Sequence, residues 1–202
     1  MTTQKQVSII VAALLPSFGI GYKNQLPWRL RNEMKYFKNV TTKNISPNHK
    51  NAVIMGRKTW ESIPSKFRPL PDRYNVILTK QDVSQFEQLE NVRYANAIDE
   101  VLQDLLQDEK IGKIFIIGGC EIYNRSLFSK LVDNLLITEI VHKKDGEVIE
   151  MDTFLDKDYI LNNFTKASAN DLKKFVGEDI EFADSKVVEG DFEYEFTLYK
   201  RN

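Results

Sequence analysis

Short apolar runs, rich in β-branched residues, alternate along the chain with stretches whose apolar residues recur at helical spacing. The runs are nearly continuous and end at turn residues, a pattern typical of strands covered on both faces in a mostly parallel sheet. We predict such strands at residues 8–15, 52–55, 75–79, 92–95, 113–117 and 135–141. Helices are predicted between them at residues 30–40, 58–63, 97–106 and 121–128.

The last predicted strand has a different pattern. Residues 192–199 alternate apolar and polar side chains, which indicates an antiparallel strand with one buried face. The fold class that follows is α/β, a single domain over residues 1–202. Its central, mostly parallel, twisted sheet carries antiparallel C-terminal edge strands and flanking helices. Residues 171–190, rich in both acidic and basic side chains, are predicted to form a surface excursion between the final strands.

Composition excludes several classes of function. The 202 residues include 28 Lys and Arg against 29 Asp and Glu, so no nucleic-acid or membrane-surface binding is expected. One cysteine and two histidines rule out a disulfide within the chain and leave little for a metal site, so we expect none. The longest apolar stretch, residues 9–15, is far below the roughly 20 residues of a membrane span, and we expect a cytoplasmic protein. Enzyme chemistry here would depend on carboxylates or on a bound cofactor.

Glu33 is the most informative polar residue of the predicted helix at 30–40. At 100° per residue it falls inside the apolar stripe formed by Leu30, Met34, Phe37 and Val40. A buried carboxylate is costly unless it is paired or used. Two interpretations remain open: a neighbouring backbone or hydroxyl donor satisfies it, or it is a lone carboxylate in an apolar pocket that binds a cationic or multiply hydrogen-bonding ligand.

Glycine, hydroxyl and basic residues follow three of the predicted strands. Ligands of parallel sheets bind at the carboxyl ends of strands, where glycine lets backbone approach closely and helix N-termini present N–H groups to phosphate. The residues are Gly56, Arg57, Lys58 and Thr59, then Thr79 and Lys80, then Gly118, Gly119 and Cys120. Singly, such basic residues are ordinary solvated loop charges, but together they suggest a dinucleotide with an extra phosphate.

The glycine fingerprint of Rossmann domains is absent. Gly19 and Gly21 supply two of its three glycines, and no acidic residue follows at the required place. The stretch from there to Trp28 is better interpreted as a flexible loop ahead of the Glu33 helix, which suits a lid.

Together these motifs resemble the dihydrofolate reductase family in its fungal form. They occur in the family's order between residue 7 and about residue 200. They are Ile10-Val11-Ala12-Ala13, Gly19-Ile20-Gly21, Leu26-Pro27-Trp28-Arg29-Leu30, Glu33 with Phe37, residues 53–64, residues 67–73, and Ile116-Ile117-Gly118-Gly119. The resemblance implies reduction of 7,8-dihydrofolate to tetrahydrofolate with hydride from NADPH. It also implies binding of 2,4-diaminopyrimidine antifolates.

The resemblance assigns roles around the substrate. Glu33 matches the active-site acid that binds the pterin amino and ring N–H groups, with Trp28 holding a water and Thr138 oriented behind it. Arg73 matches the arginine that binds the α-carboxylate of the glutamate tail. The full set matching the substrate cleft is Ile10, Val11, Glu33, Met34, Phe37, Ser62, Ile63, Leu70, Arg73, Ile117, Tyr123 and Thr138.

It also assigns the cofactor loops, whose cations imply a preference for NADPH over NADH. The matching residues are Ala12, Ile20, Gly21, Lys23, Leu26, Gly56, Arg57, Lys58, Thr59, Leu78, Thr79, Lys80, Ile117, Gly118, Gly119, Cys120, Glu121, Ile122 and Tyr123. The family has a cis peptide bond at Gly118–Gly119. Departures from its commonest pattern are Cys120 for alanine, Asn24 for glycine, and Thr79 and Lys80 for serine and arginine.

Two other functions are compatible with this fold. One is a pterin or pyrimidine reductase of riboflavin synthesis, which Arg73 argues against because its substrate has no glutamate tail. The other is a non-catalytic nucleotide- or RNA-binding module, which the balanced charge argues against. We expect a monomer with no obligate protein partner.

Overall fold

The chain divides into two compact units, and three secondary-structure elements contribute residues to both. The computed structural model describes residues 5–202, so residues 1–4 of the predicted 1–202 domain lie outside the described residues. Unit 1 contains residues 5–9 and Thr41–Asp133, and unit 2 contains Ile10–Val40 and Asn134–Asn202. The shared elements are β1 (Val7–Leu14), α1 (Arg31–Thr42) and β7 (Val132–His142). A single domain remains a prediction, and each unit is described separately.

Unit 1 is built on parallel strands in the order β1-β6-β3-β4-β5. Their bounds are β3 (Lys50–Gly56), β4 (Arg73–Leu78), β5 (Val92–Ala95) and β6 (Ile111–Gly118). The strands pair in parallel throughout, and β1 joins them through Val7–Ile9. In β3 the side chains of Ala52–Met55 are 0% exposed, as the continuous apolar runs predict. This arrangement confirms the mostly parallel sheet.

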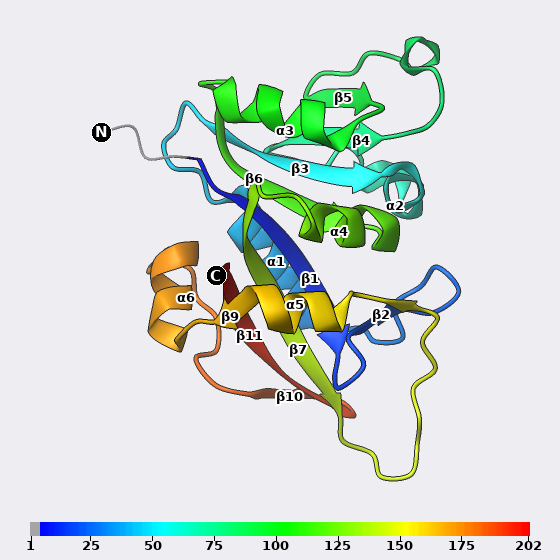
Figure 1. Ribbon diagram of the computed structural model, residues 1–202, viewed down its shortest axis with the longest axis vertical. Coiled ribbons are helices and arrows are strands. Elements are labelled where there is room, and N and C mark those ends of the chain that lie inside the picture. Colours follow the sequence, from blue (N-terminus) through cyan, green and yellow to red (C-terminus); the bar gives the residue numbers. More distant parts are fainter. Residues whose placement is uncertain (1–4) are drawn as a thin grey trace. The chain divides into compact units, whose positions relative to one another are not determined.

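Three helices and two 3-10 turns follow these strands along the chain (Figure 1). The helices are α2 (Arg57–Ser62), α3 (Ile98–Gln107) and α4 (Cys120–Leu127), and the turns are Ser65–Phe67 and Val83–Gln85. Helix α3 buries an apolar face at the i, i+3, i+4 and i+7 positions, which are Ile98, Val101, Leu102 and Leu105. Because each crossover returns the chain to a parallel strand, the carboxyl ends of β3, β4 and β6 share one edge of the sheet.

Unit 2 contains the antiparallel strands. The long strand β11 (Phe192–Arg201) pairs with β7, with β9 (Phe164–Lys166) and with β10 (Val187–Glu189). The short strands β2 (Gly19–Gly21) and β8 (Thr153–Phe154) pair with each other, and β2 also pairs with β1. Helices α5 (Lys157–Asn163) and α6 (Ala169–Val176) complete the unit. The predicted antiparallel C-terminal strand at 192–199 is thus confirmed.

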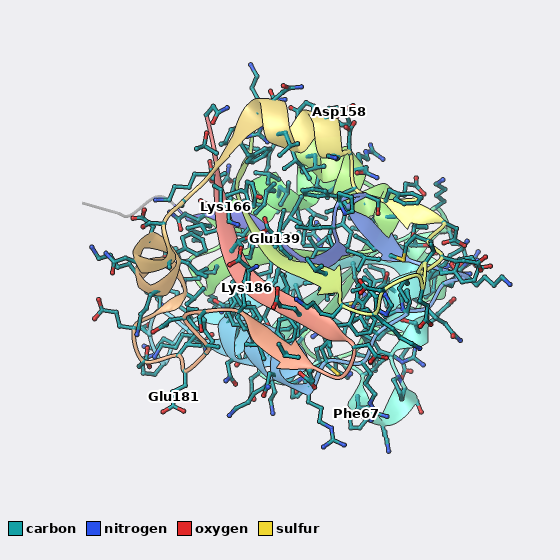
Figure 2. The ribbon with its side chains drawn as sticks, turned by 90° about the horizontal axis from the view of Figure 1, so that it is seen from below. Phe67, Glu139, Asp158, Lys166, Glu181 and Lys186 are labelled. Carbon is teal, nitrogen blue, oxygen red and sulfur yellow. The ribbon has the colours of Figure 1, made fainter. Side chains whose placement is uncertain are left out.

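The two faces of β7 and β11 have different coverings, α1 on one side and α5 on the other (Figures 1 and 2). Thr138 of β7 lies opposite Phe196 of β11, and the Phe196 ring stacks on Tyr36 of α1 with centroids 3.9 Å apart. On the opposite face Glu139 of β7, which is 7% exposed, forms an ion pair with Lys166 of β9, an exposed side chain whose Nζ lies 2.8 Å away. Figure 2 shows Glu139 and Lys166 close to each other. The α1 face is therefore the one that can surround Glu33.

Some predicted elements need correction. Residues 171–190 are not only a surface excursion, because they contain most of α6 and all of β10. Helix α6 begins after Ser168, whose hydroxyl accepts from the Asp171 backbone N–H, and it ends at Gly177 with a φ of 117°. These are ordinary helix start and stop signals hidden by the charged composition. Helix α5 and strand β9 were not predicted. Within the described residues no helix is both long and apolar enough to cross a membrane.

Candidate active site

Helix α1 carries Glu33 on its buried side. Tyr36 is 3% exposed and Val40 is 1% exposed, and Glu33 lies partly buried on the same side of the helix. The prediction that Met34 belongs to the buried stripe is wrong, because Met34 is 60% exposed. The stripe is turned toward Tyr36, which leaves Met34 at its edge and places Glu33 near its centre.

The carboxyl group of Glu33 has an unusual acidity. Burial raises its pKa to about 7, and the negative charge of Glu189 contributes in the same direction. Among residues 5–202 no side chain or backbone group donates a hydrogen bond to it. The structure therefore favours the interpretation of a lone carboxyl in apolar surroundings. Near neutral pH this group is divided between its acid and its ionised form.

Two further predicted residues of unit 2 are buried. Trp28 is 6% exposed, and its indole Nε1 finds no hydrogen-bond acceptor within the described residues. Its ring meets Phe192 edge to face, with centroids 6.4 Å apart. Thr138 is 3% exposed and, by its register with Phe196, lies on the sheet face that α1 covers. A buried N–H without a protein acceptor is available to a water or a ligand.

The predicted lid contains a tight turn. Tyr22 and Gln25 exchange backbone hydrogen bonds of 2.9 Å in both directions, and Lys23 and Asn24 between them have φ values of 48° and 60°. This is the geometry of a two-residue hairpin loop, for which asparagine is favoured. The Lys23 backbone N–H also donates to Asp152, 2.8 Å away.

The other residues of unit 2 that match the family lie close by in the chain. Of these, Ile10, Val11, Ile20 and Gly21 are buried, Ala12 and Phe37 are half-buried, and Leu26 is 60% exposed. The exposed and half-buried residues of this group are apolar, so they leave apolar surface that a ligand could cover.

The candidate phosphate loops of unit 1 approach each other at two glycines. Gly56 precedes α2, Gly119 precedes α4, and neither helix start has a side-chain cap. A Cβ added to Gly56 would lie 3.9 Å from the Gly119 nitrogen, and one added to Gly119 would lie 3.2 Å from Thr59 Oγ1. Backbone N–H groups without a capping side chain are suitable donors for a pyrophosphate. The donors present therefore fit a dinucleotide.

Two basic side chains beside these loops form ion pairs at the surface. Arg57 lies 2.6 Å from Glu61, with both side chains more than one third exposed, and Lys80 lies 3.4 Å from Glu121. Exposed pairs of this kind contribute only about 0.2–1 kcal/mol. A phosphate can therefore replace the carboxylate partner of either cation at small cost. Lys58 is also exposed.

Strand β6 ends in a peptide bond between Gly118 and Gly119 that is cis, as the resemblance implies. Gly118 has a φ of 125°, and a Cβ there would lie 3.2 Å from the Tyr123 ring. Both the backbone conformation and the lack of space require glycine at this position. The neighbouring Cys120 thiol lies 3.4 Å from the Asn124 side-chain nitrogen.

Arg73 is held rigidly at the start of β4. It is 4% exposed, its Nε donates to the Pro71 carbonyl at 3.0 Å and its Nη1 donates to Thr41 Oγ1 at 2.9 Å. Its Nη2 makes no hydrogen bond to any residue in the described part of the chain. The outer side of the guanidinium fork thus keeps donors for a carboxylate.

The remaining predicted residues of unit 1 lie near these groups in the chain. Ser62 donates to the Thr59 carbonyl at 2.6 Å, and Ile63, Leu70, Ile117 and Ile122 are half-buried, while Leu78, Thr79 and Tyr123 are buried.

Several polar residues that make structural hydrogen bonds could not be identified from the sequence. Asn75, 0% exposed, exchanges hydrogen bonds of 2.9 and 3.0 Å with the Leu70 backbone, which fixes the loop ahead of Arg73. Glu189 and Tyr194 form contacts around the start of α1 that are described below. A polar residue inside an apolar run was the available signal for Asn75, but nothing in the sequence connects Glu189 with α1.

The family model and the known proteins that this chain resembles all have the same description. A family model described as dihydrofolate reductase matches residues 6–181. Dihydrofolate reductase of Candida albicans is 51% identical over 199 residues, which cover 98% of this chain and 99% of that protein. Dihydrofolate reductase of Saccharomyces cerevisiae is 40% identical over 202 residues, with 95% of each chain covered. Among solved structures, Schistosoma mansoni dihydrofolate reductase has a TM-score of 0.71 at 28% identity, covering 98% of this chain and 99% of that one.

Proposed function

Because the chain belongs to the dihydrofolate reductase family, we propose that it reduces 7,8-dihydrofolate to 5,6,7,8-tetrahydrofolate with NADPH. The observation that carries this proposal is the carboxyl of Glu33, which is desolvated, has a pKa of about 7 and receives no hydrogen bond from the described protein. Such a group is ready to bind a ligand that presents several N–H donors.

Glu33 binds and orients the substrate in this proposal. One ionised carboxylate accepts two parallel hydrogen bonds from the pterin amino and ring N–H groups, which holds the ring in a reactive position. Its negative charge also favours protonation of the nearby pterin imine nitrogen. The unpartnered Trp28 Nε1 supplies a donor for a water beside the ring, and the Thr138 hydroxyl lies on the same sheet face as α1. These assignments give unit 2 the pterin end of the substrate.

Unit 1 is assigned the glutamate tail and the phosphate groups of the cofactor. The open side of the Arg73 guanidinium binds the α-carboxylate as a fork, which a lysine could not do. Bound NADPH supplies the hydride. The chain's own contribution is to orient the dinucleotide through the backbone of the Gly56 and Gly118–Gly119 loops and through Arg57, Lys58, Thr59, Thr79 and Lys80.

The proposed function also has consequences for the location, oligomeric state and ligands of the protein. We expect a cytoplasmic monomer that binds 2,4-diaminopyrimidine antifolates through Glu33 and acts without a nucleic acid, a membrane or an obligate protein partner. The near-neutral charge balance of 28 basic and 29 acidic residues supports the expectation about nucleic acids.

The direct test is the near-ultraviolet absorbance of NADPH on mixing the purified protein with dihydrofolate. We expect the absorbance to fall only when both compounds are present. A pyrimidine intermediate of riboflavin synthesis in place of dihydrofolate is the matched control and should give no turnover. Absence of turnover with micromolar dihydrofolate would contradict the proposal.

Cofactor selectivity gives a second test. Arg57→Ala should raise the KM for NADPH about 10- to 100-fold, because a charge-assisted phosphate contact contributes roughly 1.5–3 kcal/mol, and leave the KM for NADH nearly unchanged. Arg93→Ala is the matched control, since Arg93 also forms an exposed ion pair, with Asp104 at 2.7 Å. An equal loss with both cofactors would refute the assignment of Arg57 to the extra phosphate.

A further inference from the structure

We propose that Glu189, on the hairpin of β10 and β11, is a positioning residue that caps the helix carrying Glu33, an inference that rests on the proposed function. Glu189 lies far from Glu33 in the chain and on a different element, and no motif of the sequence connects the two.

Helix α1 has no cap of its own. The Met34 backbone N–H donates to the Leu30 carbonyl at 3.1 Å, so Leu30 occupies the N-cap position and Glu33 is the third residue of the helix. A leucine side chain has no oxygen to accept the first helical N–H groups. Glu189 takes this role from outside: its Oε1 lies 2.5 Å from the Arg31 nitrogen and its Oε2 lies 3.4 Å from the Asn32 nitrogen. One carboxylate thus satisfies the first two donors of the helix.

The hairpin holds this carboxylate in place. Tyr194, 1% exposed, donates its hydroxyl to Glu189 Oε2 at 2.8 Å. Glu189 pairs with Phe192 across a two-residue turn in which Gly190 has a φ of 60°. The Phe192 ring in turn contacts Trp28. The same hairpin therefore touches the start of α1 and the tryptophan that precedes it.

The cap changes the electrostatics of the third helical residue. A carboxylate at this position of a helix is ordinarily stabilised by the positive end of the dipole, which lowers its pKa. Here Glu189 occupies that end. Burial acts to raise the pKa of Glu189, but the Arg31 N–H, the Tyr194 hydroxyl and the Asn32 N–H outweigh it and hold the pKa below its usual range. Glu189 therefore stays ionised while Glu33 retains its proton to near neutral pH.

The other titratable groups around Glu33 do not produce this division. Tyr36 on the same helix and Tyr194 on β11 both have their pKa raised, first by burial, so their hydroxyls stay neutral. Arg31 is exposed and its charge acts on Glu189. Among residues 5–202, Glu189 is the charged group that acts on Glu33, and its negative charge makes ionisation of Glu33 less favourable.

The decisive measurement is an NMR titration of the Glu33 side-chain carboxyl in the ligand-free protein. In Glu189→Gln the amide oxygen still accepts one helical N–H, but the negative charge is gone. We expect the titration midpoint of Glu33 to fall toward the value that burial alone would set, because the like charge of Glu189 is removed. The matched control is Glu193→Gln, which removes a carboxylate of the same hairpin whose partners are Lys143 and Lys186. It should leave the midpoint unchanged.

Kinetics and hydrogen exchange separate positioning from simple stabilisation. The acid limb of kcat/KM for dihydrofolate, along which Glu33 gains its proton, should move to lower pH by the same amount in Glu189→Gln, with the KM for NADPH unaltered. Glu189→Ala should also lose exchange protection at the Arg31 and Asn32 amides, which Glu189→Gln should partly restore. A Glu33 midpoint in Glu189→Gln equal to that of the unmodified protein would overturn the proposal. Because the titration needs no substrate, it tests Glu189 even if dihydrofolate turnover, and with it the proposed function, fails.

Discussion

Glu33→Gln is expected to lower kcat/KM for dihydrofolate at pH 7 by at least two orders of magnitude. The amide keeps the shape of the side chain but turns an NH2 group toward the N–H donors of the pterin and carries no charge. Losing two charge-assisted hydrogen bonds of roughly 1.5–3 kcal/mol each corresponds to about 10²- to 10⁴-fold. Steady-state kinetics at saturating NADPH measure the effect.

The loss should be confined to the substrate side of the reaction. NADPH affinity, followed by quenching of tryptophan fluorescence, should change less than about twofold, since the residues assigned to the dinucleotide phosphates belong to unit 1. Glu193→Gln, a carboxylate of the same unit in exposed ion pairs, should retain full turnover. Undiminished turnover in Glu33→Gln would eliminate the carboxyl from the reaction.

The same substitution is expected to make the folded protein more stable at alkaline pH. The pKa of Glu33 is about 7 in the folded state and about 4.3 in an unfolded chain. Because the folded state holds this proton more tightly, the wild-type protein loses stability as the pH rises from about 4 to about 7. At pH 8 nearly the full cost, about 3.5 kcal/mol, is present in wild type and absent in Glu33→Gln.

Urea unfolding at pH 5 and pH 8 measures this difference. The free energy of unfolding of Glu33→Gln should exceed that of wild type by about 3.5 kcal/mol at pH 8, and the excess should be smaller by about 2.5 kcal/mol at pH 5. A difference between the two proteins that is independent of pH would show that Glu33 titrates normally. A stability gain coupled to lost turnover is the expected signature of a strained functional group.

Sequence reasoning succeeded where a short segment contained the whole signal. The buried strands were predictable because parallel strands are covered on both faces and read as continuous apolar runs, and residues 92–95 have the observed bounds of β5. Glu33 could be recognised because helical periodicity alone places it on an apolar stripe. The three glycine and basic loops could be placed at one edge because parallel strands share their direction.

Prediction from the sequence failed where a contact joins residues that are distant in the chain, or where the element is short. The cap of α1 comes from 158 residues away in the chain, and no local pattern predicts that contact. The rotation of α1 that buries Tyr36 and exposes Met34 is decided by Phe196 and Phe182, whose rings contact Tyr36. Strand β10 has three residues, too few to establish a period of two.

The position of β11 has a consequence for how the protein is made. This strand lies between β7 and β10 and also pairs with β9, yet it is synthesised after all three. The face of unit 2 that receives α1 is therefore incomplete until residues 192–201 have left the ribosome, and Tyr36 has no Phe196 to stack on before then. Unit 2 cannot form during translation from its first segment, residues 10–40, even though that segment holds Trp28 and Glu33. The assembly of unit 2 is therefore a late step of folding, because it brings together segments that are far apart in the chain.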